Sequence, residues 1–70
     1  MGKTIYNRIK VVLTERNITS RQLAKHLDKT ETTVSRWCTN DTQPPVEVLY
    51  EIARFLDVEV YDLLVPIKKV

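Results

Sequence analysis

The sequence predicts an all-α fold of five short helices with a central helix-turn-helix. Apolar residues recur at spacings of three and four over most of the 70-residue chain, as they do on the buried face of a helix. Thr and Asn residues with the properties of helix caps stand between these stretches. The alternation of apolar and polar residues at Val58-Glu59-Val60 is too short to predict a strand. We expect one domain over residues 1–70, with a tail at 65–70.

The first helix is predicted over about residues 4–16. Four apolar residues fall at i, i+4, i+7 and i+8, which places them on one helix face: Ile5, Ile9, Val12 and Leu13. Asn17 follows this stretch. Because asparagine adopts the left-handed backbone conformation more readily than most residues, it is expected to end the helix in place of a glycine.

The second helix is predicted to begin directly after Thr19. The Thr19 hydroxyl can accept a hydrogen bond from the backbone of the first turn, and Gln22 three residues later completes a capping box. The predicted buried face consists of Leu23, Ala24 and Leu27. The small Ala24 side chain would allow another helix to approach closely.

A third helix is predicted after a connection of two residues, Asp28 and Lys29. Thr30 is the expected N-cap, and Glu31 is placed to interact favourably with the positive end of the helix dipole. The expected core-facing residues are Val34, Trp37 and Cys38. The other side chains are polar and leave one face of the helix outside the core: Glu31, Thr32, Thr33, Ser35 and Arg36.

Residues 39–45 predict a loop, because turn-forming residues gather there and Pro44 and Pro45 lack a backbone donor. A fourth helix is expected from about Val46 to its end at Asp57. Its apolar residues again recur at helical spacing: Leu49, Ile52, Ala53 and Leu56. Residues 61–64 predict one last helical turn, which Pro66 ends.

Charge is distributed unevenly along the chain. Residues 1–40 hold eight basic and three acidic residues, a net charge of +5, whereas residues 41–70 hold three basic and six acidic residues. This asymmetry indicates that one face of the protein meets a polyanion such as nucleic acid.

The composition argues against several other classes of protein. Cys38 is the single cysteine, so it forms no intramolecular disulfide, and with the single histidine, His26, it supplies too few ligands for a structural zinc site. No apolar run approaches the roughly 20 residues of a membrane span, and residues 1–10 lack the apolar core of a secretory signal. No third group is placed to form a catalytic triad with His26 and Cys38, and there is no glycine-rich phosphate loop. We expect a cytoplasmic protein that is not an enzyme and needs no metal, cofactor or small-molecule substrate.

Two short helices joined by a tight turn, the second with a polar outer face, match the helix-turn-helix pattern at about residues 19–38. Residues 19–27, TSRQLAKHL, resemble the positioning helix of the phage-repressor (Cro-like, XRE) family, and residues 33–37, TVSRW, fall at its recognition helix. The resemblance covers about residues 5–64, with matching positions at Pro44, Leu49, Ile52, Ala53, Leu56, Val58, Asp62, Leu63 and Leu64. The family usually has glycine, glutamate and glycine at three positions where this chain has Asp28, Cys38 and Asn40.

The resemblance implies a sequence-specific transcriptional regulator, a repressor or an activator, that inserts its third helix into the major groove of double-stranded DNA. Base contacts are then expected from Glu31 to cytosine, Thr32 to thymine and Arg36 to guanine. Phosphate contacts are expected from Ser20, Arg21, Lys25, Lys29, Thr33 and Asn40. Simpler interpretations stay open: Arg36 as a solvated charge and Glu31 as a helix-dipole residue. Trp37 is interpreted as a core residue, Cys38 as a half-buried hydrophobe and His26 as a surface residue.

A homodimer is expected, because one two-turn recognition helix contacts too few base pairs to specify a single genomic site. The predicted interface consists of apolar residues beyond the fourth helix: Val60, Tyr61, Leu64, Ile67 and Val70. The alternative function is a protein-interaction module, such as an antitoxin with secondary DNA binding. Against it, only the few residues after Leu64 are spare for wrapping a partner, and Lys68 and Lys69 are expected to be solvated.

Overall fold

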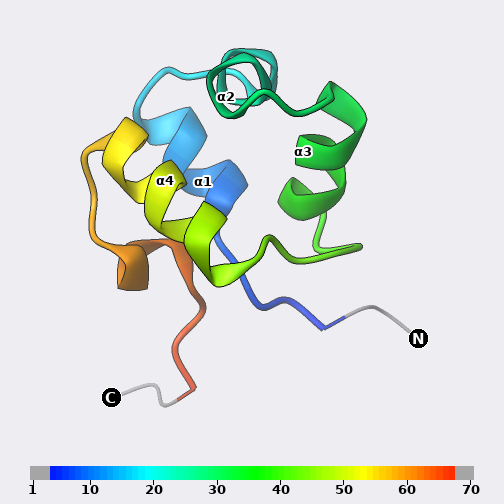
Figure 1. Cartoon of the computed structure of the whole chain (residues 1–70). Helices are drawn as coiled ribbons and strands as arrows, with labels where there is room; N and C mark the ends of the chain where they lie inside the picture. The colour runs from blue at the N-terminus through cyan, green and yellow to red at the C-terminus, as the bar shows by residue number, and fades with distance from the viewer. Residues whose placement is uncertain (1–3, 68–70) are drawn as a thin grey trace.

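The computed structural model describes residues 4–67, and within that range the chain forms four α-helices, one short 3-10 helix and no strand (Figure 1). The α-helices are α1 (Ile9–Glu15), α2 (Ser20–Leu27), α3 (Glu31–Cys38) and α4 (Val46–Leu56). The 3-10 helix, η1, spans Val60–Leu63. The all-helical class is therefore confirmed. The count of five α-helices is not, since the last predicted helix is a 3-10 turn of four residues.

The described α-helices are each followed by a residue in the left-handed backbone region. These residues are Asn17, Asp28, Asn40 and Asp57, with φ angles of 58°, 58°, 64° and 57°. The single glycine of the sequence is Gly2, so no glycine stands at these turns. Asn and Asp tolerate this conformation because their short polar side chains bond locally to the backbone. The predicted ends of the first and fourth helices are thus confirmed.

Both helices of the helix-turn-helix begin at the predicted caps. The Gln22 amide donates to Thr19 Oγ1 over 3.1 Å, and the Thr19 amide donates to Gln22 Oε1 over 2.8 Å, which completes the capping box. At the start of α3, the Thr33 amide donates to Thr30 Oγ1 over 3.1 Å. These bonds satisfy backbone donors that a helix N-terminus otherwise leaves without a partner.

The prediction that the first helix begins at about residue 4 is wrong, because α1 begins at Ile9. Residues 4–8 lie outside any helix, with a bridge between Asn7 and Leu64, and Ile5 is 53% exposed instead of buried. The Arg8 amide donates to the Leu63 carbonyl, and the Val65 amide donates to the Tyr6 carbonyl. Tertiary hydrogen bonds therefore replace the helix that the apolar spacing favoured.

The core lies where the α-helices and η1 meet, with α2 in contact with both α3 and α4. Its fully buried side chains come from every helical element: Ile9, Leu13, Leu23, Val34, Ile52 and Leu63. Ala24 and Trp37 are also buried, as predicted. Leu27, Cys38 and Leu49 are half-buried at the edge of this core. Within the described part of the chain, no helix is both long and apolar enough to cross a bilayer.

Candidate nucleic-acid interface

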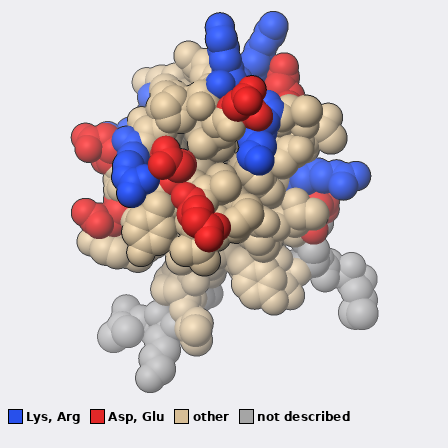
Figure 2. Space-filling model, in the orientation of Figure 1, with Lys and Arg blue, Asp and Glu red and all other residues tan. Residues whose placement is uncertain are grey.

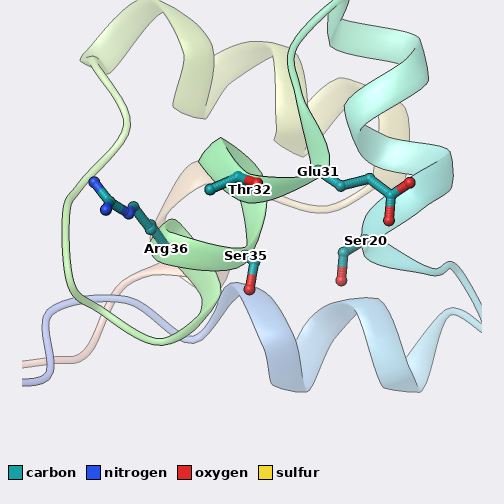
Figure 3. Close-up of a pocket in the computed structure, with 5 residues that line it drawn as sticks. All are labelled: Ser20, Glu31, Thr32, Ser35 and Arg36. Atoms are coloured by element: carbon teal, nitrogen blue, oxygen red, sulfur yellow. The ribbon is translucent and has the colours of Figure 1, made fainter.

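A polar hollow of about 360 Å³ lies between the N-terminus of α2 and the outer face of α3 (Figure 3). It is lined by five side chains: Ser20, Glu31, Thr32, Ser35 and Arg36. In Figure 3 the Glu31 side chain extends toward Ser20, whereas the Arg36 side chain extends toward the loop that follows α3. Because none of the five is apolar, the hollow presents hydrogen-bond donors and acceptors.

The three residues predicted to contact bases line this one hollow. Glu31, Thr32 and Arg36 are all exposed on α3. Thr32 and Arg36 share a face because residues four apart on a helix are neighbours. Arg36 offers a planar fork of donors, Glu31 accepts only, and Thr32 can do both. This set of groups is suited to the differing donor and acceptor patterns of base edges.

Ser35 belongs to the same hollow, although it was expected only as a polar residue of the third helix. It lies three residues after Thr32 and four after Glu31, so the helical repeat places it beside them. Its spacing from Glu31 and Thr32 could therefore have placed Ser35 at this site from the sequence. A serine hydroxyl can donate to a phosphate, and it can donate to or accept from a base edge.

Three basic residues predicted to contact phosphate are exposed on α2 and in the turn after it: Arg21, Lys25 and Lys29. Figure 2 shows Lys and Arg side chains projecting at the top of the molecule, where α2 lies in Figure 1, with acidic side chains among them. The surface there carries both signs of charge, with long basic side chains reaching furthest from the body of the protein.

Arg21 and Glu31 form an ion pair between the first turns of α2 and α3. The Arg21 Nε atom lies 3.6 Å from Glu31 Oε2, and the two side chains are 83% and 65% exposed. Such an exposed pair contributes little to stability, since water and salt screen it. Its effect is local: a cation stands beside the one acidic side chain of the hollow.

Ser20 and Thr33 are half-buried near the N-termini of α2 and α3. The Ser20 hydroxyl lines the hollow and is hydrogen-bonded to the Cys38 thiol. The Thr33 hydroxyl lies 2.9 Å from Thr30 Oγ1. Both helix N-termini carry partial positive charge, which favours a nearby phosphate.

Asn40 was expected to contact the DNA backbone, and the structure corrects this assignment. Its side chain is only 7% exposed, and Oδ1 accepts hydrogen bonds from the amides of Tyr6 and Asn7 and from Gln43 Nε2. Its Nδ2 donates to the Asn7 carbonyl. A side chain that already has four partners inside the protein is not free to bind phosphate.

Cys38 and His26 are held in structural contacts. Burial raises the pKa of the Cys38 thiol, and Lys10 and the Ser20 hydrogen bond oppose this rise without cancelling it. The thiol therefore stays protonated at neutral pH and is a poor nucleophile. The His26 ring stacks on Phe55 with ring centroids 4.1 Å apart. Among residues 4–67, no group of three or more His, Cys, Asp and Glu side chains is placed to hold a metal ion.

The chain matches the helix-turn-helix family over residues 9–63, which includes every helical element from α1 to η1. It belongs to this family, in its phage-repressor (XRE) branch. This helix-turn-helix protein is also similar to a solved structure, that of a candidate DNA-binding protein from Bacteroides fragilis. The two share 44% identity over 89% of this chain and 100% of that chain, with a TM-score of 0.86. Comparison with curated proteins finds no match.

Proposed function

We propose that this protein is a cytoplasmic, sequence-specific DNA-binding transcriptional regulator. The observation that carries the proposal is the polar hollow on the outer face of α3, within a helix-turn-helix whose two helices are capped and packed against each other. The similar protein from Bacteroides fragilis is itself a candidate DNA-binding protein. In this role α3 enters the major groove, and α2 lies across the phosphate backbone.

Glu31, Thr32 and Arg36 contact bases in this proposal, with Ser35 as an additional contact from the same hollow. Ser20 and Thr33 bind phosphate at the helix N-termini, while Arg21, Lys25 and Lys29 supply positive charge. When α3 is in the groove, the Arg21 side chain stays close enough to Glu31 to offset its negative charge, so the acidic residue does not repel the DNA. Bound at an operator, the protein would act as a repressor or an activator of transcription.

The proposed assembly is a two-fold homodimer on a two-fold operator. Exposed apolar side chains after α4 support it, because Tyr61, Leu64 and Ile67 are 73%, 37% and 100% exposed. Val60 is half-buried, and Val70 lies outside the described residues. Ile5 and Tyr6 extend this exposed surface, since the Tyr6 carbonyl bonds to the Val65 amide.

Selection of bound sequences from random duplex DNA tests the function. We expect a two-fold consensus whose half-sites lie about 34 to 36 Å apart, one turn of the duplex. The complex should contain two protein chains, as measured by sedimentation, and moving one half-site by five base pairs should abolish tight binding. Failure to enrich any sequence would favour the protein-interaction role instead, and one chain per duplex would exclude the dimer.

A further inference from the structure

The N-terminal segment, residues 4–8, is bonded to the turn that follows α3 by a buried polar network. Figure 1 shows this segment running from α1 past the loop between α3 and α4. The network consists of the side chains of Asn7, Asn40 and Gln43 with the backbone groups they bond. Asn7 is 3% exposed and Asn40 is 7% exposed, so these amides are the buried polar residues of the described chain.

The hydrogen bonds of this network run in both directions between the N-terminal segment and the turn after α3. Asn40 Oδ1 lies 2.9 Å from the Tyr6 amide and 3.0 Å from the Asn7 amide, and Asn40 Nδ2 donates back to the Asn7 carbonyl over 3.2 Å. Asn7 Nδ2 donates to the Trp37 carbonyl over 2.9 Å and to Gln43 Oε1 over 2.7 Å. No buried side-chain N or O atom in the described residues lacks a partner. A fully bonded buried network of this kind makes the local structure rigid.

Residues that follow α3 also bond to the last helical turn of α3, which carries Arg36. The Arg36 carbonyl accepts hydrogen bonds from the Asp41 amide at 2.9 Å, the Thr42 amide at 3.3 Å and Thr39 Oγ1 at 3.2 Å. The next carbonyl, that of Trp37, accepts from the Asn40 amide as well as from Asn7. The C-terminal carbonyls of α3 are therefore bonded by residues that the network holds in place.

A helix of eight residues is not stable without tertiary support, so its orientation depends on how its two ends are held. Thr30 and the packing of α2 hold the N-terminal end. The N-terminal segment holds the other end through Asn7 and Asn40. A bidentate contact from an arginine fork requires precise placement of the backbone that carries it.

We propose that Asn7 and Asn40 are positioning residues for the contact that Arg36 makes with its base pair, although neither touches DNA. This inference rests on the proposed function. It assigns the N-terminal segment to the DNA-binding machinery and explains the presence of an amide side chain at a left-handed turn where a glycine would fit.

The test compares Asn40→Gly with Ile52→Val, a control that lowers stability in the core away from the hollow. Glycine keeps the left-handed φ of 64° and removes the amide group. Binding is measured at a temperature below the thermal unfolding of each variant. It is measured on the selected duplex and on a second duplex, in which the base pair that Arg36 is proposed to contact is replaced. Coupled neighbouring residues show interaction energies equivalent to roughly 2- to 150-fold in affinity, so we expect Asn40→Gly to lose at least about fivefold on the selected duplex. It should lose less than about twofold on the replaced duplex, and Ile52→Val should change neither.

A double-mutant cycle gives the second readout. In an Arg36→Ala background, Asn40→Gly should have almost no further effect, because no guanidinium remains to be positioned. Equal losses on both duplexes, or an undiminished loss in the Arg36→Ala background, would show that the network stabilises the fold only. If Asn40→Gly does not fold, Gln43→Ala is used instead, since it removes the hydrogen bonds of the Gln43 side chain to Asn7 and Asn40. It should show the same difference between the two duplexes, with a smaller loss of affinity. Absence of any selected DNA would refute the proposed function, whereas selective DNA binding with unchanged discrimination would refute this inference alone.

Discussion

Arg36 is the residue to which the proposed sequence specificity is most sensitive. It is exposed at the hollow, and the ion pairs formed within residues 4–67 do not include it. We predict that Arg36→Ala costs about 1 to 3 kcal/mol of binding free energy on the selected duplex and relaxes the requirement at one base pair. Titrations against a panel of single-base-pair variants measure both effects.

Lys25→Ala is the matched control for Arg36→Ala. Lys25 is exposed on α2 and does not line the hollow, and its proposed partner is a phosphate. The substitution should weaken binding to every duplex by a similar factor. If Arg36→Ala also weakens all sequences equally, Arg36 contacts phosphate and the assignment of a base contact is wrong.

Cys38 provides a prediction for pH at the residue scale. Burial raises the pKa of its thiol, so the folded protein holds the proton more tightly than the unfolded chain does. The resulting stability is complete below the unfolded pKa of about 8.5 and is lost as pH rises through the higher folded value. Urea denaturation at intervals between about pH 8 and 10 should therefore show a steeper loss of stability in the natural protein than in Cys38→Ala. Parallel curves for the two proteins would show that the thiol does not contribute.

At the scale of the element, each described α-helix is followed by an Asn or Asp residue in the left-handed region. Asp57 closes α4 with φ of 57° and is exposed, so substitutions there change the backbone preference with little effect on packing. The left-handed conformation costs most residues about 1 to 2 kcal/mol, and a β-branched residue tolerates it poorly. We predict that Asp57→Val lowers the free energy of unfolding by about 1 to 2 kcal/mol, while Asp57→Gly leaves it unchanged or raises it by up to about 1 kcal/mol.

Chemical denaturation of the two Asp57 variants measures this difference. Both substitutions remove the same carboxylate from the C-terminus of α4, so the charge effect on the helix dipole cancels between them. Equal stabilities for the valine and glycine variants would mean that the chain relaxes out of the left-handed turn without cost.

For the whole molecule, the basic N-terminal half of the chain predicts a strong dependence of DNA affinity on salt. A dimer that makes about 6 to 10 phosphate contacts should lose roughly 10³- to 10⁵-fold in affinity between about 50 and 200 mM salt. Fluorescence anisotropy on the selected duplex across this range gives the slope. A nearly flat response would contradict the phosphate contacts assigned to α2, and no binding at low salt would favour a protein partner.

The sequence alone was sufficient to predict α2, α3 and most of the candidate interface, because these features depend on neighbours in the chain. The caps at Thr19 and Thr30 form within one helical turn, and the left-handed turn at Asp28 is a property of that residue type. The helical repeat then determines which side chains share the outer face of α3. Even Ser35 was predictable from this repeat.

Only the tertiary structure decided the start of α1 and the role of Asn40. The apolar spacing at Ile5 favours a longer helix, but amide donors at Tyr6 and Asn7 bond to a side chain 34 and 33 residues away. Local patterns carry no information on partners at that separation, and a buried network forms only where the fold brings all its members together. The spacing of apolar residues therefore predicted the helices themselves, whereas long-range hydrogen bonds determined how the N-terminal segment meets the end of α3.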